Sequence, residues 1–285
     1  MPGRQGGAIE KTMHVAIFDS GVGGLTVLAD ALQAMPGDRF TYYADTDQVP
    51  YGCKTRAQVR ERVVRVVSFI AALGIDALVV ACNTATSAAV VELRRRFPFP
   101  VIGMEPAVKP ALARTGENGG NAAGEKRVLV AATPLTLREE KFQRLVETVD
   151  REGLVDPLPL PELVDFAERG EFTERKILPY LQDRLAPFDL ANYGTVVLGC
   201  THFLFFRRHF RLALPPGIDL IDGNQGTVNQ LRRTLAARRA THEEAGERAG
   251  ERVTYFESDR RVTDPAAIAR FASLLRRYED DRDAG

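Results

Sequence analysis

Two stretches of the chain end an apolar run on a cysteine, in "LVVACNTATSA" from Leu78 and in "VVLGCTHFLF" from Val196. A free cysteine usually behaves as a small buried apolar residue, so either thiol alone would be interpreted as structural. Cys82 and Cys200, however, are each followed by Asn or Thr at the start of an expected helix. In that position the helix dipole lowers a thiol pKa from its usual value of about 8.5. Two thiols placed in the same way predict chemistry at sulfur.

His202 lies two residues after Cys200 and could assist it. A Cys-x-His pair can also bind zinc, but a tetrahedral site needs three or four protein ligands. The remaining histidines lie in unpromising segments: His14, His209 and His242. We therefore expect no metal. A nucleophilic Cys200 with His202 as its base stays an alternative, because acyl transfer needs only one thiol, one base and an oxyanion site. It leaves Cys82 without a role, and we interpret Cys53 as incidental.

The segment "DSGVGGLTV" places Asp19 and Ser20 before a glycine-rich turn, whose backbone N–H groups could bind a carboxylate or phosphate. Dinucleotide binding is disfavoured, because Gly21, Gly23 and Gly24 do not follow the spacing G-x-G-x-x-G. A tight strand-to-helix turn capped by Asp19 or Ser20 is the alternative.

A second polar loop, "ADTDQVPYG", offers an aromatic ring and free backbone groups. Its residues of interest are Asp45, Asp47, Pro50, Tyr51 and Gly52. In open parallel sheets, ligands bind at the carboxyl ends of strands, where loops meet helix N-termini. The loop therefore indicates a small polar pocket.

The elements that must position these residues are strands and helices in alternation. The expected strands are "HVAIFDS", "FTYYAD", "DALVVACN", "PVIGM", "RVLVAATP", "GTVVLGC", "IDLIDG" and "RVTYFES". Continuous apolar strands that alternate with helices indicate parallel sheets buried on both faces, and so an α/β fold. Because each half carries one strand that ends on a thiol, we expect two similar domains with largely parallel sheets flanked by helices.

Polar segments suggest where these domains are divided. The stretch "ARTGENGGNAAGEK", residues 113–126, is expected to be a linker. The first domain would span residues 13–112, with residues 220–285 returning to it, and the second residues 125–219. We expect the stretch "ARRATHEEAGERAGERV" to be a mobile surface segment before the last strand and a helix after Pro265, and residues 1–12 to be a flexible tail.

The composition is that of an ordinary enzyme of 285 residues, 45% of them hydrophobic, which is enough for a large core. Lys and Arg together number 38, as do Asp and Glu, so no overall basic field predicts a nucleic-acid partner. No apolar run is long enough to cross a bilayer, and the first residues lack the apolar centre of a signal peptide. With three dispersed cysteines, these features predict a cytoplasmic protein with free thiols and no membrane partner.

The motifs together resemble those of a known family. "FDSGVGGLTV", "PYG", "ACNTAT", "ATPLT" and "VLGCTH" occur in the order and spacing of the glutamate racemases, within the cofactor-independent aspartate/glutamate racemase superfamily. The resemblance extends from about His14 to Gly226. The chain departs from the family after "GCTH", where "FLFF" replaces the usual tyrosine, proline and leucines.

The resemblance implies two α/β domains with the active site at their interface. Cys82 would exchange the Cα proton of D-glutamate and Cys200 that of L-glutamate. His202 would assist Cys200, and the assisting carboxylate would be Glu168 in "FAERG", with Glu162 as the alternative. The residues implied to hold or assist the amino acid are Asp19, Ser20, Pro50, Tyr51, Gly52, Asn83, Thr84, Thr136, Thr201 and His202.

The two thiols suit this reaction, because inversion of a stereocentre by proton transfer requires a base on one face of Cα and an acid on the other. No cofactor is implied, since a pyridoxal enzyme needs a Schiff-base lysine beside a phosphate cup, and Lys109, the nearest candidate, is expected at the surface. The resemblance implies D-glutamate supply for peptidoglycan and a homodimer. Alternatives are a racemase for aspartate or another small amino acid, and an amino-acid-binding relative without activity.

Overall fold

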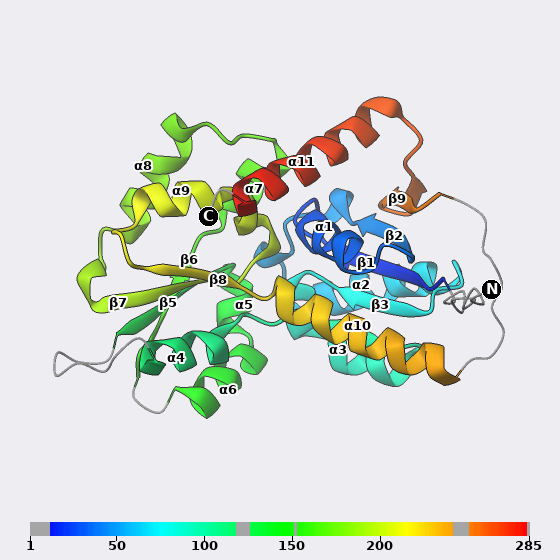
Figure 1. Ribbon diagram of the computed structural model, residues 1–285, viewed down its shortest axis with the longest axis horizontal. Helices are drawn as coiled ribbons and strands as arrows, with labels where there is room; N and C mark the ends of the chain where they lie inside the picture. Colours follow the sequence, from blue (N-terminus) through cyan, green and yellow to red (C-terminus); the bar gives the residue numbers. More distant parts are fainter. Residues whose placement is uncertain (1–11, 118–125, 151–152, 242–250, 284–285) are drawn as a thin grey trace, which may run out of the picture.

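The computed structural model describes residues 12–117, 126–150, 153–241 and 251–283. They form two sheets that lie side by side, each flanked by helices (Figure 1). The six-stranded sheet has the order β10 (Arg260–Arg261), β9 (Val253–Glu257), β2 (Arg39–Ala44), β1 (His14–Asp19), β3 (Ala77–Val80) and β4 (Val101–Gly103). The four-stranded sheet has the order β6 (Val155–Pro159), β5 (Arg127–Ala132), β7 (Tyr193–Leu198) and β8 (Asp219–Asp222). All the paired strands are parallel except β9 and β10, so the expected α/β class is confirmed.

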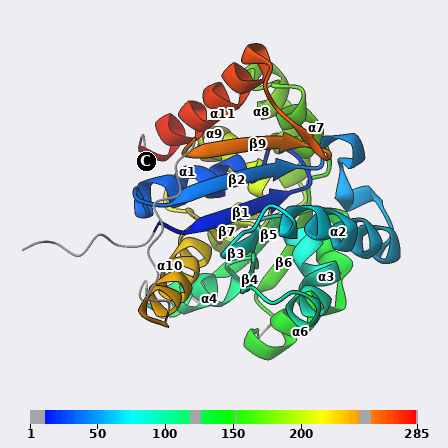
Figure 2. The same cartoon turned by 90° about the vertical axis from the view of Figure 1, so that its right-hand side faces the viewer.

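Helices cover both faces of the six-stranded sheet (Figure 2). Val15 and Ile17 of β1 face one side, and Ala16 and Phe18 face the other, as the two-residue period of a strand requires. The first side packs against α1 (Leu25–Ala34), α10 (Asn224–Thr241) and α11 (Pro265–Asp283). The second packs against α2 (Arg56–Ala71) and α3 (Asn83–Arg96). Burial on both faces explains why β1 is a continuous apolar run.

The four-stranded sheet is covered in the same way. Val128 and Val130 of β5 face a cluster that includes α4 (Val108–Glu117) and α6 (Glu140–Val149). Leu129 and Ala131 face the other side, with α7 (Glu162–Glu168), α8 (Glu174–Leu185) and α9 (Arg207–Ala213). The hydrophobic cluster on this other side also contains the residues packed between the six-stranded sheet and α1, so one hydrophobic core extends through both halves.

The carboxyl ends of the central strands of both sheets point toward the boundary between the halves (Figure 1). The chain crosses this boundary after β4, on its way to α4, and again after β8, on its way to α10. Short elements lie at the ends of the strands: η1 (Thr46–Gln48), η2 (Tyr51–Cys53), α5 (Pro134–Arg138) and η4 (Thr201–Phe206), with η3 (Leu190–Asn192) before β7.

Two expected loops are partly helical. The linker was expected from Ala113, but α4 continues to Glu117, because its buried side pairs Val108 and Ala111 with the four-stranded sheet. The polar stretch from Ala237 was also expected to be irregular, but α10 continues to Thr241. Its Leu231 and Leu235 are buried, and alanine and arginine are strong helix formers that suit the exposed side.

Residues 118–125 and 242–250 of those two segments, and residues 1–11 of the expected tail, lie outside the described residues. The predicted domain ranges stay a prediction, although β8 places residues up to Asp222 in the four-stranded sheet. Among the helices of the described ranges, none combines the length and the apolar character needed to cross a bilayer.

Candidate active site

Cys82 follows β3 and is the N-cap of α3, buried at the carboxyl end of the first sheet. Its Sγ accepts a hydrogen bond from the backbone N–H of Ala85 at 3.4 Å. The thiol also lies 3.5 Å from the hydroxyl oxygen of Ser20, to which it can donate. The expected position at a helix N-terminus is therefore present.

The pKa of this thiol differs from the sequence-based expectation, which was wrong. Burial, with a further contribution from the charge of Asp19, raises the pKa of Cys82 to about 12. The hydrogen bonds with Ala85 and Ser20 act in the opposite direction but are weaker. Loss of water around a buried ion outweighs a helix terminus, because full burial can shift a pKa by about 3–5 units. In the free protein Cys82 is therefore a neutral thiol at neutral pH.

Cys200 follows β7 in the other half and is buried as well. The α-helix expected directly after it is instead the 3₁₀ helix η4, and α9 begins only at Arg207. This tighter turn brings His202 back toward the thiol, with Nδ1 at 3.8 Å from Cys200 Sγ. His202 Nε2 lies 2.7 Å from Oε1 of Glu168, at the end of α7. The arrangement is a thiol, an imidazole and a carboxylate in series.

The imidazole in this series favours its protonated form. Burial by itself lowers the pKa of His202, but the hydrogen bonds and charges of Cys200 and Glu168 outweigh it and raise the pKa well above 6.5. Burial by itself raises the pKa of Glu168. The contacts with His202 and the hydrogen bond from the N–H of Val22 outweigh burial and lower this pKa. The positive imidazole thus lies between the Glu168 carboxylate and the Cys200 sulfur.

Asp19 joins the two halves. Its Oδ1 accepts from the Gly21 N–H at 3.1 Å and from the Ser20 hydroxyl at 3.3 Å. Its Oδ2 accepts from the Thr201 hydroxyl at 3.0 Å. Burial raises the pKa of Asp19, against the opposing charge of His202. The carboxyl group thus holds the glycine-rich turn of one half and the threonine after Cys200 of the other.

The glycines of that turn are required by close packing. A Cβ added at Gly21 would lie 1.8 Å from Oε1 of Glu168, and one at Gly23 would lie 2.4 Å from both His202 Nδ1 and Thr201 Oγ1. Real Cβ atoms essentially never approach other atoms this closely. Because these glycines lack side chains, the Glu168–His202 pair, which belongs to the half with the four-stranded sheet, can pack directly against the turn, which belongs to the other half.

Hydroxyl groups from both halves surround the Cys82 side. The hydroxyls of Thr84, Thr133 and Thr136 form a triangle with oxygen distances of 2.9–3.0 Å. Thr84 is in α3, whereas Thr133 and Thr136 follow β5. Sequence reasoning missed Thr133, although its place directly after a strand that ends "VAAT" is a usable signal. Next to Thr84, the amide oxygen of Asn83 is buried without a hydrogen-bond partner among the described residues.

The polar loop contributes the Tyr51–Gly52 turn, after a cis Val49–Pro50 peptide. The Tyr51 hydroxyl donates to Asp45 Oδ2 at 2.6 Å. A Cβ at Gly52 would lie 2.8 Å from Thr133 Cβ, so the turn packs directly against the hydroxyl triangle. The loop thus packs against the hydroxyl triangle, and the small polar pocket expected there stays a prediction.

Other candidates lie apart from the thiols. Glu162, at the other end of α7, accepts hydrogen bonds from Tyr180 and Arg184. Cys53 is exposed at the end of η2. His209 contacts the carbonyl oxygen of Phe172. Within the described ranges, the structure brings together no group of three or more metal-ligating side chains.

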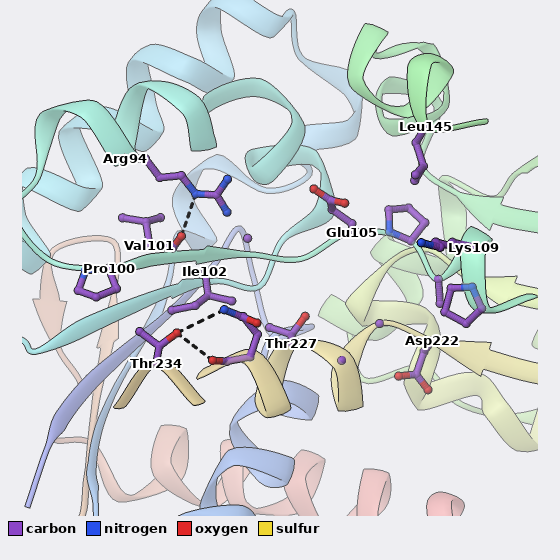
Figure 3. Close-up of a pocket in the computed structure, with 17 residues that line it drawn as sticks. Arg94, Pro100, Val101, Ile102, Glu105, Lys109, Leu145, Asp222, Thr227 and Thr234 are labelled. Carbon is purple, nitrogen blue, oxygen red and sulfur yellow. Dashed lines mark hydrogen bonds between the residues drawn. The ribbon is translucent and has the colours of Figure 1, made fainter. Parts of the chain in front are cut away.

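A cavity of about 660 Å³ lies between β4, the segment before α4, and α10 (Figure 3). Its charged lining includes Arg94, Glu105 and Lys109, and Arg94 Nε donates to the carbonyl of Val101 at 3.0 Å. None of the residues expected to bind substrate lines it. This cavity is therefore separate from the two thiols.

Comparison with known proteins points to one family. Residues 19–231 match the family model described as Asp/Glu/Hydantoin racemase. The chain is 55% identical to the glutamate racemase of Halothermothrix orenii over 78% of its own length and 85% of the relative's, and 47% identical to glutamate racemase 2 of Bacillus subtilis over 92% and 95%. The structure of Escherichia coli glutamate racemase, in complex with L-glutamate and the activator UDP-MurNAc-Ala, aligns with a TM-score of 0.76 and 30% identity over 94% of this chain and 95% of that one.

Proposed function

Because this chain belongs to the Asp/Glu/Hydantoin racemase family, and is thus an isomerase of amino acids, we propose that it interconverts L- and D-glutamate through the thiols of Cys82 and Cys200. One observation carries the mechanism. The two buried thiols come from opposite halves of the molecule, and within the described residues only Cys200 has a His–Glu pair behind it. A reaction with a base on one face of Cα and an acid on the other requires two such proton-transfer groups, one deprotonated and one protonated.

In the direction from L- to D-glutamate, the Cys200 thiolate takes the Cα proton. The electron pair left on Cα is stabilised by hydrogen-bond donors around the substrate carboxylate, which act without reorganisation because they are already in place. The Cys82 thiol then gives its proton to the opposite face. In the reverse direction the two sulfurs exchange roles. His202 keeps the negative sulfur stable, and Glu168 keeps His202 charged.

The groups proposed to bind glutamate lie around the two sulfurs. The amide oxygen of Asn83 has no hydrogen-bond partner in the part of the chain that the structure describes, and it suits the substrate ammonium group. The hydroxyls of Thr84, Thr136 and Thr201 and the backbone of the Tyr51–Gly52 turn suit its carboxylates. Ser20 and Asp19 lie between the thiols, and Pro50 sets the start of the turn. We expect glutamate to fit better than aspartate, because a shorter side chain would move Cα out of line with the sulfurs.

The remaining parts of the proposal concern the cell. D-glutamate made by this chain would enter peptidoglycan, and a reducing cytoplasm would keep Cys53, Cys82 and Cys200 free, as they are in the structure. A homodimer is proposed from the family resemblance. An aspartate racemase and a non-catalytic amino-acid-binding protein are the alternatives.

Circular dichroism of L- or D-glutamate incubated with the protein tests the activity, with aspartate as the comparison. Run in D2O, the reaction tests the mechanism. Early product should carry deuterium at Cα while unreacted substrate stays protonated, because the proton is taken by one sulfur and supplied by the other. Label returned equally to both enantiomers would indicate a single base. Equal kcat/KM for glutamate and aspartate would refute the substrate assignment.

A further inference from the structure

Asp45 is a fully buried carboxylate at the end of β2 that the proposed chemistry does not use. Arg62 of α2 donates to both of its oxygens, Nε to Oδ2 at 2.8 Å and one terminal nitrogen to Oδ1 at 2.6 Å. The Tyr51 hydroxyl donates to Oδ2 at 2.6 Å, and the Ser258 hydroxyl donates to Oδ1 at 3.1 Å. The Asp45 N–H also donates to the carbonyl of Asp19 at 3.0 Å. A buried charge with this many donors holds its neighbours in one geometry.

Ser258 belongs to the turn between β9 and β10, beyond residues 19–231 that match the family model. Strand β9 lies beside β2 (Figure 2). Ser258 and Asp259 have φ angles of 43° and 69°, the left-handed region that disfavours most side chains. Both are held there by contacts with the strand and loop next to them: Ser258 Oγ accepts from Asp47 N at 3.0 Å, and Asp259 accepts from the Tyr43 hydroxyl at 2.7 Å.

The contacts continue from Asp45 to the substrate groups. Tyr51 is buried, so its ring cannot move without its neighbours. The next residue, Gly52, packs against Thr133 of the hydroxyl triangle. A shift of Asp45 would therefore change the distance between the Tyr51–Gly52 backbone and those hydroxyls. Displacements of about 1 Å can lower a rate about a hundredfold when they misplace a reacting atom.

We infer that Ser258 is a positioning residue for the amino acid, acting through Asp45 on the Tyr51–Gly52 turn; the inference rests on the proposed function of that turn. Ser258 touches neither thiol nor the His202–Glu168 pair. Loss of the Ser258 hydroxyl should therefore weaken glutamate binding while leaving the rate of proton transfer nearly unchanged. Both enantiomers should be affected alike, since the turn serves both.

Ser258→Gly is the sharpest test, because glycine adopts a φ of 43° without strain but lacks the hydroxyl. We expect KM for glutamate to rise about tenfold, equivalent to roughly 1.4 kcal/mol, with kcat changed less than threefold. Tm should change little, because relief of the left-handed strain by glycine opposes the loss of the hydroxyl's hydrogen bonds with Asp45 and Asp47. A merely structural serine would give the opposite pattern, a lower Tm with KM unchanged.

Arg260→Gln is the matched control in the same hairpin. It removes the ion pair between Arg260 and Asp47, whose side chains are 65% and 50% exposed respectively. Surface ion pairs of this kind contribute little to stability. KM should stay at the parent value. The double variant Ser258→Gly with Tyr51→Phe adds a second test: if both act through Asp45, the rise in KM will be smaller than the product of the single effects.

The outcomes separate this inference from the proposed function. If the parent racemises glutamate but Ser258→Gly leaves KM unchanged, or if the double variant is strictly multiplicative, the positioning role is overturned. If the parent racemises another amino acid, the proposed substrate is wrong, and the same KM comparison with that amino acid decides the role of Ser258.

Discussion

Replacing Glu168 with glutamine removes the negative charge behind His202 and keeps a hydrogen-bonding group of nearly the same shape. The Glu168 and His202 side chains are 13% and 2% exposed, so solvent screens their interaction weakly. A hydrogen bond to a charged group contributes about 1.5–3 kcal/mol and a neutral one about 1 kcal/mol. The difference of roughly 0.5–2 kcal/mol predicts a loss of about 2- to 30-fold in kcat/KM at neutral pH.

The same change should shift the pH dependence. Glu168 contributes to raising the pKa of His202, so the glutamine variant should lose the imidazolium at a lower pH. The high-pH limb of kcat/KM should move to lower pH accordingly. The two enantiomers have equal free energies, so kcat/KM must change equally in both directions.

The stability of the pair has its own pH window. The folded pKa of His202 is raised above 6.5, so its contribution is full below about pH 6.5 and is lost as the pH rises through the raised value. The folded pKa of Glu168 is lowered below 4.5, so its contribution is full above about pH 4.5 and is lost as the pH falls through the lowered value. The Tm deficit of Glu168→Gln should therefore be largest between these limits.

Glu162→Gln is the matched control, because Glu162 lies on the same helix but contacts Tyr180 and Arg184 instead of His202. Initial rates with L- and D-glutamate across pH, followed by circular dichroism, compare the two variants. The assignment of Glu168 would be wrong if Glu162→Gln slowed racemisation more, or if Glu168→Gln kept the parent profile.

Three other predictions address the thiols, the glycine-rich turn and the cofactor. Cys82→Ser and Cys200→Ser should each abolish racemisation, because serine is too weak an acid and base to replace the thiol. Each variant should still eliminate chloride from one enantiomer of 3-chloroglutamate, the L form with Cys82→Ser and the D form with Cys200→Ser, because elimination needs one base only. Release of 2-oxoglutarate measures the elimination. Racemisation near the parent rate by either variant would show that the replaced cysteine is structural. Gly23→Ala should lose activity through its clash with His202, whereas Gly226→Ala, where a Cβ meets open space, should keep it; an active Gly23→Ala would contradict the packing. Activity should survive dialysis against a chelator, and loss that zinc restores would show that the thiols bind metal.

The fold could be predicted from the sequence because both faces of each sheet are covered. Burial on two sides makes β1, β3, β5 and β7 largely continuous apolar runs. The polar residues at the carboxyl ends of these strands could also be identified, because a continuous apolar run shows where its strand ends. The ends of α4 and α10 could not, because "ARTGE" and "ARRAT" have no apolar period of their own and continue helices whose buried residues precede them.

The choice between Glu162 and Glu168 shows where sequence reasoning reaches its limit. The two residues are six positions apart on α7, which places them about 120° apart around the helix axis. Only one can face His202, and which one depends on how α7 packs. Thr133 and Ser258 depend on packing in the same way. Neither stands in a pattern that predicts a site, and each becomes important through a partner far away in the chain, Thr84 and Asp45 respectively.

The unequal surroundings of the two thiols carry the mechanism one step further. Burial raises the pKa of the Cys82 thiol, whereas the Cys200 sulfur lies against His202, whose own pKa is raised. In the proposed mechanism, removal of the proton of L-glutamate requires a thiolate at Cys200 and a thiol at Cys82. D-glutamate requires the opposite form, with the proton on Cys200. A symmetric reaction on an enzyme with unequal thiols therefore needs substrate groups to offset the difference, and the ammonium group of the bound amino acid can do so by lowering the cost of a thiolate at Cys82.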